Sequence, residues 1–152
     1  MADYDGEYAR GAYVELVPHY YGDYIRQLFN IAAPLMLITA PFYANNLTIE
    51  LPFEIVGALV LVALAALTNP HKQTIVVADA VAAGLGLLVY GTWALLTYDN
   101  SSWLQFILRE VIALLFLTAF YFSMKTVRAF ALHQIGKHDE AGEFDEESGA
   151  KQ

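Results

Sequence analysis

Four runs of apolar residues, interrupted by short polar stretches, dominate this chain. They cover residues 31–44, 53–67, 74–96 and 103–124. An α-helix needs roughly 20 residues to cross about 30 Å of hydrocarbon, a length that the last two runs reach alone and the first two reach with flanking residues. We therefore predict four membrane-spanning helices, with bounds near 25–44, 51–68, 74–97 and 102–125.

The polar stretches predict how these helices connect. Residues 45–48 (NNLT), 68–73 (TNPHKQ) and 98–102 (YDNSS) are rich in Asn, Pro and Ser, which favour turns and helix caps. We expect Ser101 or Ser102 to cap the fourth helix. The predicted fold is an all-α polytopic membrane protein in which residues 19–132 form four transmembrane helices, arranged as two hairpins.

The two ends of the chain have different patterns. Residues 1–18 form an acidic, Tyr-rich segment. Residues 19–30 carry apolar and polar positions at helical spacing, which predicts an amphipathic segment that lies at the inner interface and bends into the first helix. Residues 133–152 have many acids and few apolar side chains, so they cannot bury enough surface to fold alone. We expect them to form a disordered acidic tail.

The composition agrees with a membrane protein and excludes several other classes. Of the 152 residues, 57% are hydrophobic, which is too many for an ordinary soluble domain of this size. Sixteen acidic residues against eight basic ones give a net charge of −8, which argues against nucleic acid as a partner. The chain contains no cysteine, which excludes thiol chemistry. The lipid bilayer is the expected surrounding.

The basic residues predict the orientation. Arg and Lys occur before the first run, between the second and third runs and after the fourth, whereas residues 45–52 and 98–102 contain none. Positively charged loops stay on the cytoplasmic side. We therefore expect a protein of the cytoplasmic membrane with both termini in the cytoplasm.

Asp79 is a carboxylate inside the third run. It lies about five residues, or roughly 7 Å, past the cytoplasmic end of the predicted helix. An acid at this depth needs a partner, water or a proton. Arg26 and Asn30 lie at a comparable depth on the first helix, and we expect them to be the partners of Asp79.

A second polar group belongs to the outer half of the membrane. Glu54 lies near the start of the second run, and Arg109 and Glu110 lie about six residues inside the fourth. Their depths predict an ion pair between Arg109 and Glu54. Glu110 points about 100° away from Arg109 and needs another partner or a proton.

Small residues share a helix face with Asp79. Ala83, Gly86 and Tyr90 continue the stripe at helical spacing. Small side chains let a neighbouring helix approach closely. We therefore predict a packing groove along the third helix.

Catalytic chemistry finds little support in the sequence. It contains no H-E-x-x-H, G-x-S-x-G or phosphate-binding loop motif, and its four histidines fall outside the apolar runs. We expect no enzyme activity, no metal site and no cofactor.

The leading hypothesis is a non-enzymatic structural or accessory membrane subunit. The alternative is a small ion- or proton-coupled carrier or channel that works through the four charged residues Asp79, Glu54, Arg109 and Glu110. A second copy of the chain or a membrane-complex partner is compatible with both.

The stretch YYGDYIRQLF at 20–29, the proline-containing first run and the stretch LTNPHKQ at 67–73 resemble small four-span membrane proteins of bacteria. The resemblance covers residues 19–130. That group has no assigned activity, so the resemblance implies the topology but no chemistry.

Overall fold

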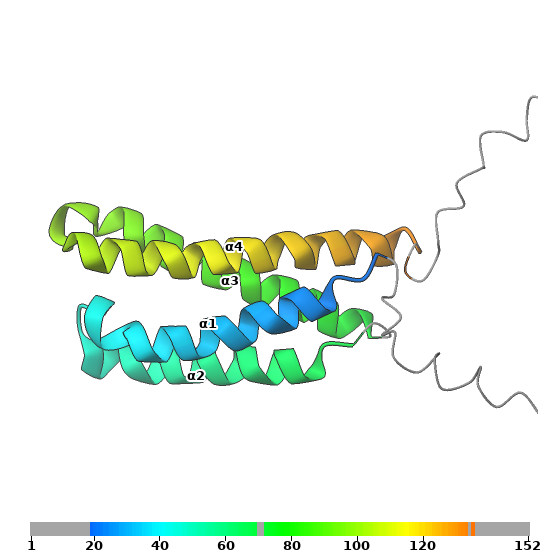
Figure 1. The fold of residues 1–152 in the computed structure, drawn as a ribbon, viewed down its shortest axis with the longest axis horizontal. Coiled ribbons are helices and arrows are strands. Elements are labelled where there is room, and N and C mark those ends of the chain that lie inside the picture. The colour runs from blue at the N-terminus through cyan, green and yellow to red at the C-terminus, as the bar shows by residue number, and fades with distance from the viewer. Residues whose placement is uncertain (1–18, 70–71, 134, 136–152) are drawn as a thin grey trace, which may run out of the picture.

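The computed structural model describes residues 19–69, 72–133 and 135. Its helices are α1 (Gly22–Tyr43), α2 (Leu47–Leu67), α3 (Gln73–Leu96), the short 3₁₀ helix η2 (Tyr98–Asn100) and α4 (Trp103–Ala131). The four α-helices are each long and apolar enough to cross a membrane (Figure 1). The predicted all-α fold with four candidate spans is therefore confirmed.

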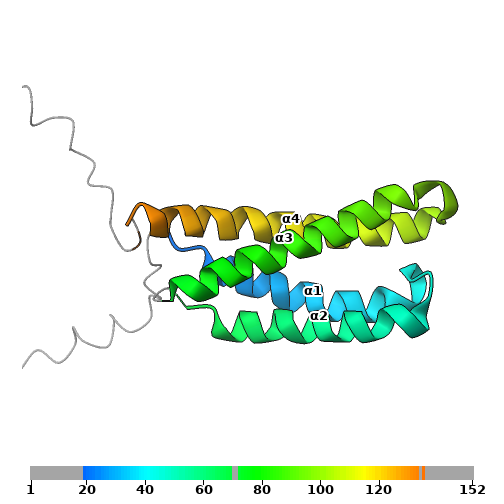
Figure 2. The ribbon, with the colours of Figure 1, turned by 180° about the vertical axis from the view of Figure 1, so that it is seen from behind.

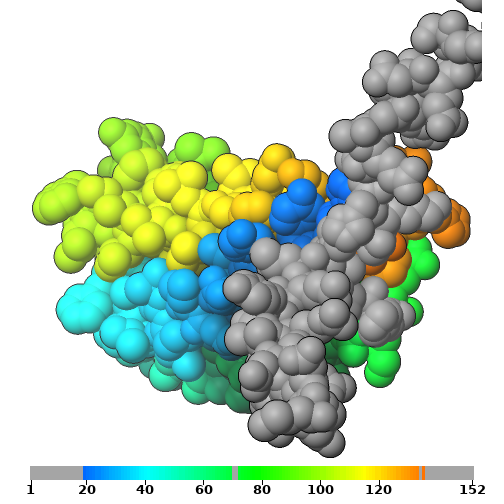
Figure 3. All heavy atoms as spheres, turned by 45° about the vertical axis from the view of Figure 1, so that its right-hand side comes forward, coloured from blue at the N-terminus to red at the C-terminus, as the bar shows by residue number. Residues whose placement is uncertain are grey.

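The four helices form two antiparallel hairpins. The hairpins are α1 with α2 and α3 with α4, and they meet where α1 packs beside α4 (Figures 1 and 3). We call the end of the bundle with the connections 44–46 and 97–102 the loop end. The opposite end, where α1 begins and α4 finishes, is the terminal end.

One of the four helix seams stays open. Figure 2 shows α3 beginning beside the end of α2 and moving away from it toward the loop end. Contacts between α2 and α3 are accordingly few, whereas α1–α2, α3–α4 and α1–α4 pack closely. The bundle is thus closed along three seams, and the α2–α3 seam opens to the outside.

The helix ends differ from the predicted ones for local reasons. Helix α2 begins at Leu47, four residues early, because the Glu50 carboxylate accepts hydrogen bonds from the backbone N–H groups of Asn45 (3.1 Å) and Asn46 (3.0 Å). These bonds satisfy donors that a helix start leaves unpaired. Ser102 caps α4 and forms a reciprocal capping box with Gln105, as expected for one of the two serines. Helix α4 runs to Ala131, six residues beyond its predicted end.

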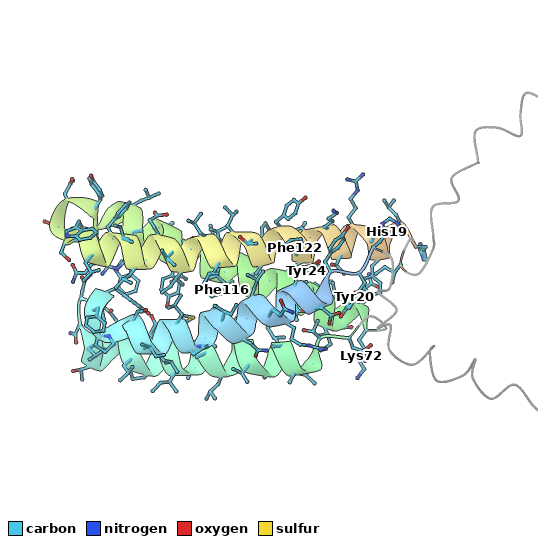
Figure 4. The ribbon with its side chains drawn as sticks, viewed as in Figure 1. His19, Tyr20, Tyr24, Lys72, Phe116 and Phe122 are labelled. Atoms are coloured by element: carbon cyan, nitrogen blue, oxygen red, sulfur yellow. The ribbon has the colours of Figure 1, made fainter. Side chains whose placement is uncertain are left out.

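The amphipathic segment predicted at 19–30 continues into the first candidate span. Helix α1 is continuous from Gly22, so this segment forms the first turns of the first span. Ile25 and Phe29 are fully buried in the bundle, and the ring of Tyr24 stacks on Phe122 of α4 at 5.1 Å between centroids (Figure 4). The apolar side of this segment therefore packs within the bundle, and its position at the membrane interface stays a prediction. The predicted N-terminal segment 1–18 and almost all of the acidic tail lie outside the described residues.

Gly86 makes room for the buried ring of Phe116. A Cβ atom at Gly86 would lie 2.4 Å from Cδ1 of Phe116, whose ring is buried and stacks on Tyr90 at 5.8 Å. We expect Gly86→Ala to lower the free energy of unfolding by about 1–2 kcal/mol, because the ring must leave its place. Gly91→Ala is the matched control, since no atom lies within 4 Å of its Cβ position. Equal midpoints for the two variants in SDS titrations followed by circular dichroism would contradict this packing.

Candidate functional site

The buried polar side chains of the described residues fall into two clusters. The loop-end cluster contains Glu54 and Arg109, together with the hydroxyl groups of Tyr43 and Tyr90. The terminal-end cluster contains Thr68, Asp79, Ser123 and Thr126.

Arg109 holds the two hairpins together at the loop end. Its fully buried guanidinium donates from Nη1 to the hydroxyls of Thr97 and Ser101 (3.0 Å to Ser101), which both lie in the α3–α4 connection. From Nη2 it donates to the backbone carbonyl of Tyr43 and to Oδ1 of Asn45 (3.1 Å), at the α1–α2 connection. One planar side chain therefore links both loops.

Trp93 completes the surroundings of this guanidinium. The Cζ atom of Arg109 lies 4.3 Å from the centre of the indole ring, a distance at which the ring face attracts a cation. Among the described residues, Arg109 forms no ion pair with a carboxylate. The guanidinium thus donates to neutral acceptors and lies over an aromatic face.

The expected ion pair between Arg109 and Glu54 was therefore wrong. Glu54 instead accepts a hydrogen bond from the hydroxyl of Tyr90, which lies 3.1 Å from the hydroxyl of Tyr43. The prediction matched the depths of the two charges but could not determine on which side of the bundle each one lies. Arg109 donates from Nη2 to acceptors of the α1–α2 connection, the Tyr43 carbonyl and Oδ1 of Asn45, instead of to Glu54.

Glu110 belongs to neither cluster. It is half-buried on α4, and it has no hydrogen bond or ion pair with the other described residues. Its predicted need for another partner or a proton stays a prediction.

Asp79 pairs with the end of α2 rather than with α1. It is fully buried, and its Oδ2 accepts a hydrogen bond from the Thr68 hydroxyl at 3.2 Å. Arg26 donates instead to the carbonyls of Ala65 (3.1 Å) and Thr68 (3.0 Å), and Asn30 is exposed. The predicted partners of Asp79 were therefore wrong, because the last carbonyls of a helix lack internal donors and attract Arg26.

The terminal-end cluster has unused hydrogen-bonding capacity. Three buried polar atoms there have no hydrogen-bond partner within the described part of the chain: Oδ1 of Asp79, Oγ of Ser123 and the hydroxyl of Tyr20. Burial and the nearby Asp23 carboxylate raise the pKa of Tyr20 to about 12, so this phenol stays neutral at physiological pH.

An apolar layer separates the clusters. Asp79 and Tyr90 are eleven residues apart on α3, which corresponds to about 16 Å along the helix. The space between them is filled by core side chains that include Met36, Ala83 and Phe116. The described residues place no buried polar side chain in this layer. They therefore provide no polar path from one end to the other.

A groove follows the open seam between α2 and α3 and extends to the loop-end cluster. It encloses about 360 Å³, and its walls include Phe53, Glu54, Gly57, Gly86, Tyr90 and Phe116. The mouth faces outward, because the wall residues Phe53 and Val89 are 75% and 55% exposed. We call this feature the α2–α3 groove.

The predicted packing stripe is buried as expected, but two functional neighbours were missed. Ala83 and Tyr90 are buried, and Gly86 accepts the ring of Phe116. The sequence reasoning overlooked Tyr43 and Thr68. Each carries a hydroxyl group and lies at the end of an apolar run, next to a predicted turn. This position in the sequence is the signal that could have identified them.

Compared with known proteins, the chain matches no family model, no curated protein and no solved structure, so the geometry of its own residues carries the functional argument.

Proposed function

We propose that this chain is a non-enzymatic accessory membrane protein that holds a small molecule of the bilayer in the α2–α3 groove. The observation that carries the proposal is the open seam with its cavity of about 360 Å³. Clefts of about 300–1,000 Å³ with apolar walls and a few polar groups are typical of small-molecule sites. Here the walls are apolar apart from Glu54 and Tyr90.

The other polar residues support this choice over an enzyme. Arg109 uses its Nη donors to join the hairpins, and Arg26 uses its donors on the end of α2. The described residues contain no group of three His, Asp or Glu side chains placed to hold a metal ion. Both arginines therefore serve the bundle itself, whereas Glu54 lines the α2–α3 groove.

A carrier or channel is the second candidate. It is favoured by the unsatisfied Oδ1 of Asp79, because an acid within a membrane helix often marks a proton or ion pathway. The apolar layer between the clusters weighs against it, since an ion crossing that layer would lose its polar partners.

The location in a cytoplasmic membrane, with both termini in the cytoplasm, is part of the proposal. The terminal end gathers the start of α1, the end of α2, the start of α3 and the end of α4, as Figure 1 shows. Arg26, Lys72, Lys125 and Arg128 lie toward this end. This distribution supports the orientation that the positive-inside rule predicts.

Photo-crosslinking tests the groove directly. A diazirine amino acid replaces Val60, which lines the groove, and the matched control replaces its neighbour Leu59, which is exposed outside it. We expect a discrete small-molecule adduct at position 60 and a mixture of bulk lipids at position 59, both read by mass spectrometry. The same lipid mixture at both positions would contradict the proposal. A protein-sized adduct at position 60 would mean that a partner helix or a second copy of the chain, rather than a small molecule, occupies the groove.

A further inference from the structure

Glu54 is a buried acid whose positive partner is missing from the described bundle. It is 7% exposed, accepts a hydrogen bond from Tyr90 and forms no ion pair with a described Lys, Arg or His. Arg109 was the cation expected to pair with Glu54 because of its depth, but both of its Nη atoms donate hydrogen bonds to the two loops. A charge removed from water is costly unless it is paired. Glu54 lies in the wall of the α2–α3 groove, so a molecule in the groove can provide that partner.

The remaining walls favour a positive group on an apolar body. Phe53, Tyr90 and Phe116 provide aromatic rings in the walls of the same groove, and Tyr90 is hydrogen-bonded to the carboxyl group. Aromatic faces attract cations through their quadrupole, most strongly where water is excluded. An anion would meet the Glu54 carboxylate without a compensating cation, and a plain hydrocarbon chain would leave that carboxylate unpaired.

The position of the groove favours a small amphiphile that is dissolved in the bilayer. Its volume of about 360 Å³ lies in the range that is typical of small-molecule sites. The exposed wall residues Phe53 and Val89 border its mouth, which opens to the surroundings of the bundle. An amphiphile dissolved in the bilayer reaches such a mouth sideways.

We propose that the α2–α3 groove binds an amphiphilic organic cation, with the positive group on Glu54 and the apolar body along α2 and α3. This inference rests on the proposed function and adds the chemical class of the molecule that is held. Glu54 and the aromatic rings select the charge, and the apolar walls of the groove accept the body.

Tetraphenylphosphonium and tetraphenylborate are suitable probes, because they share a shape and carry opposite charges. Binding of each is measured by equilibrium dialysis on the full chain in lipid nanodiscs, with empty nanodiscs subtracted. We expect saturable binding of the phosphonium and none of the borate. Glu54→Gln is expected to weaken phosphonium binding at least tenfold, whereas Glu54→Asp retains it. Glu110→Gln is the matched control, because this acid also lies within a candidate span but is only half-buried and does not line the groove.

A second variant keeps the two proposals distinguishable. Gly57→Leu narrows the groove without touching Glu54, and a Cβ at Gly57 meets only Met36, at 3.5 Å. The inference is overturned if Gly57→Leu abolishes the binding of the borate, or of both probes, while Glu54→Gln leaves the binding of both probes unchanged. The groove then binds small molecules without selecting cations. If neither variant alters any binding, the groove is no binding site, and the proposed function fails with it.

Discussion

Arg109→Met is expected to lower the free energy of unfolding by about 3–5 kcal/mol, the largest loss that we predict for a single substitution. Methionine fills a similar volume but donates no hydrogen bond, so the buried carbonyl of Tyr43 and the acceptors of Asn45, Thr97 and Ser101 lose their common donor. Removal of one member of a buried charged network typically costs this much. Unfolding in detergent micelles by SDS titration, followed by circular dichroism, measures the loss.

Two further variants show whether the cost comes from the hydrogen bonds to both loops. Arg109→Lys keeps the charge but replaces the planar fork by a single nitrogen, so we expect a loss between those of wild type and Arg109→Met. Arg128→Met removes an exposed arginine from the same helix and is expected to change stability by no more than about 0.5 kcal/mol. Spin labels on cysteines introduced at Asn46 and Asp99 should show a broader distribution of label-to-label distances in Arg109→Met, but not in Arg128→Met. An unchanged distance and midpoint would refute the connecting role.

The order and length of the helices follow from hydropathy, since every backbone group inside a bilayer must be satisfied within the protein. The four apolar runs reach about 20 residues alone or with flanking residues, and Asn-, Pro- and Ser-containing turns separate them, which predicts four helices. The ends of the helices were less predictable. Glu50 extends α2 toward its loop through bonds to two backbone N–H groups, and such a bond depends on the folded loop rather than on hydropathy.

The partners of the buried charges were harder to predict than their depths. Axial spacing placed Arg109 near Glu54 and Arg26 near Asp79, but both arginines donate to backbone carbonyls near helix ends. Backbone carbonyls are present at every position, so the pattern of charged residues cannot reveal which of them attract a guanidinium. Arg26 and Arg109 therefore donate to helix ends, whereas the buried acids Glu54 and Asp79 accept from hydroxyl groups.

The groove was equally hidden from the sequence, for a geometric reason. Gly57 and Gly86 are small enough for close helix packing, and the sequence predicted a packed face at Gly86. The oblique course of α3 away from α2 decides that this seam opens while the α3–α4 seam closes over Phe116 (Figure 2). No pattern within a single helix specifies that direction.

Thr68→Val is expected to lower the free energy of unfolding by about 2–3 kcal/mol. Valine has the shape of threonine but leaves the fully buried carboxyl group of Asp79 without a hydrogen bond from the described residues.

The Thr68 hydroxyl carries one proton and faces two acceptors, the Leu64 carbonyl at 2.7 Å and Oδ2 of Asp79 at 3.2 Å. In Asp79→Asn the amide can donate to Thr68 while the hydroxyl donates to Leu64. We therefore expect Asp79→Asn to be at least as stable as wild type.

The double variant separates a structural from a transporting Asp79. Replacing both Thr68 and Asp79 by valine removes a donor and its acceptor together, so its stability should return toward that of wild type. If Asp79 only supports the bundle, vesicles containing Asp79→Asn will show the same proton flux as vesicles containing wild type. A folded Asp79→Asn that abolishes a flux seen with wild type would make Asp79 a working part of a carrier. The apolar layer above it would then have to open during transport, because Met36, Ala83 and Phe116 close the path in this state.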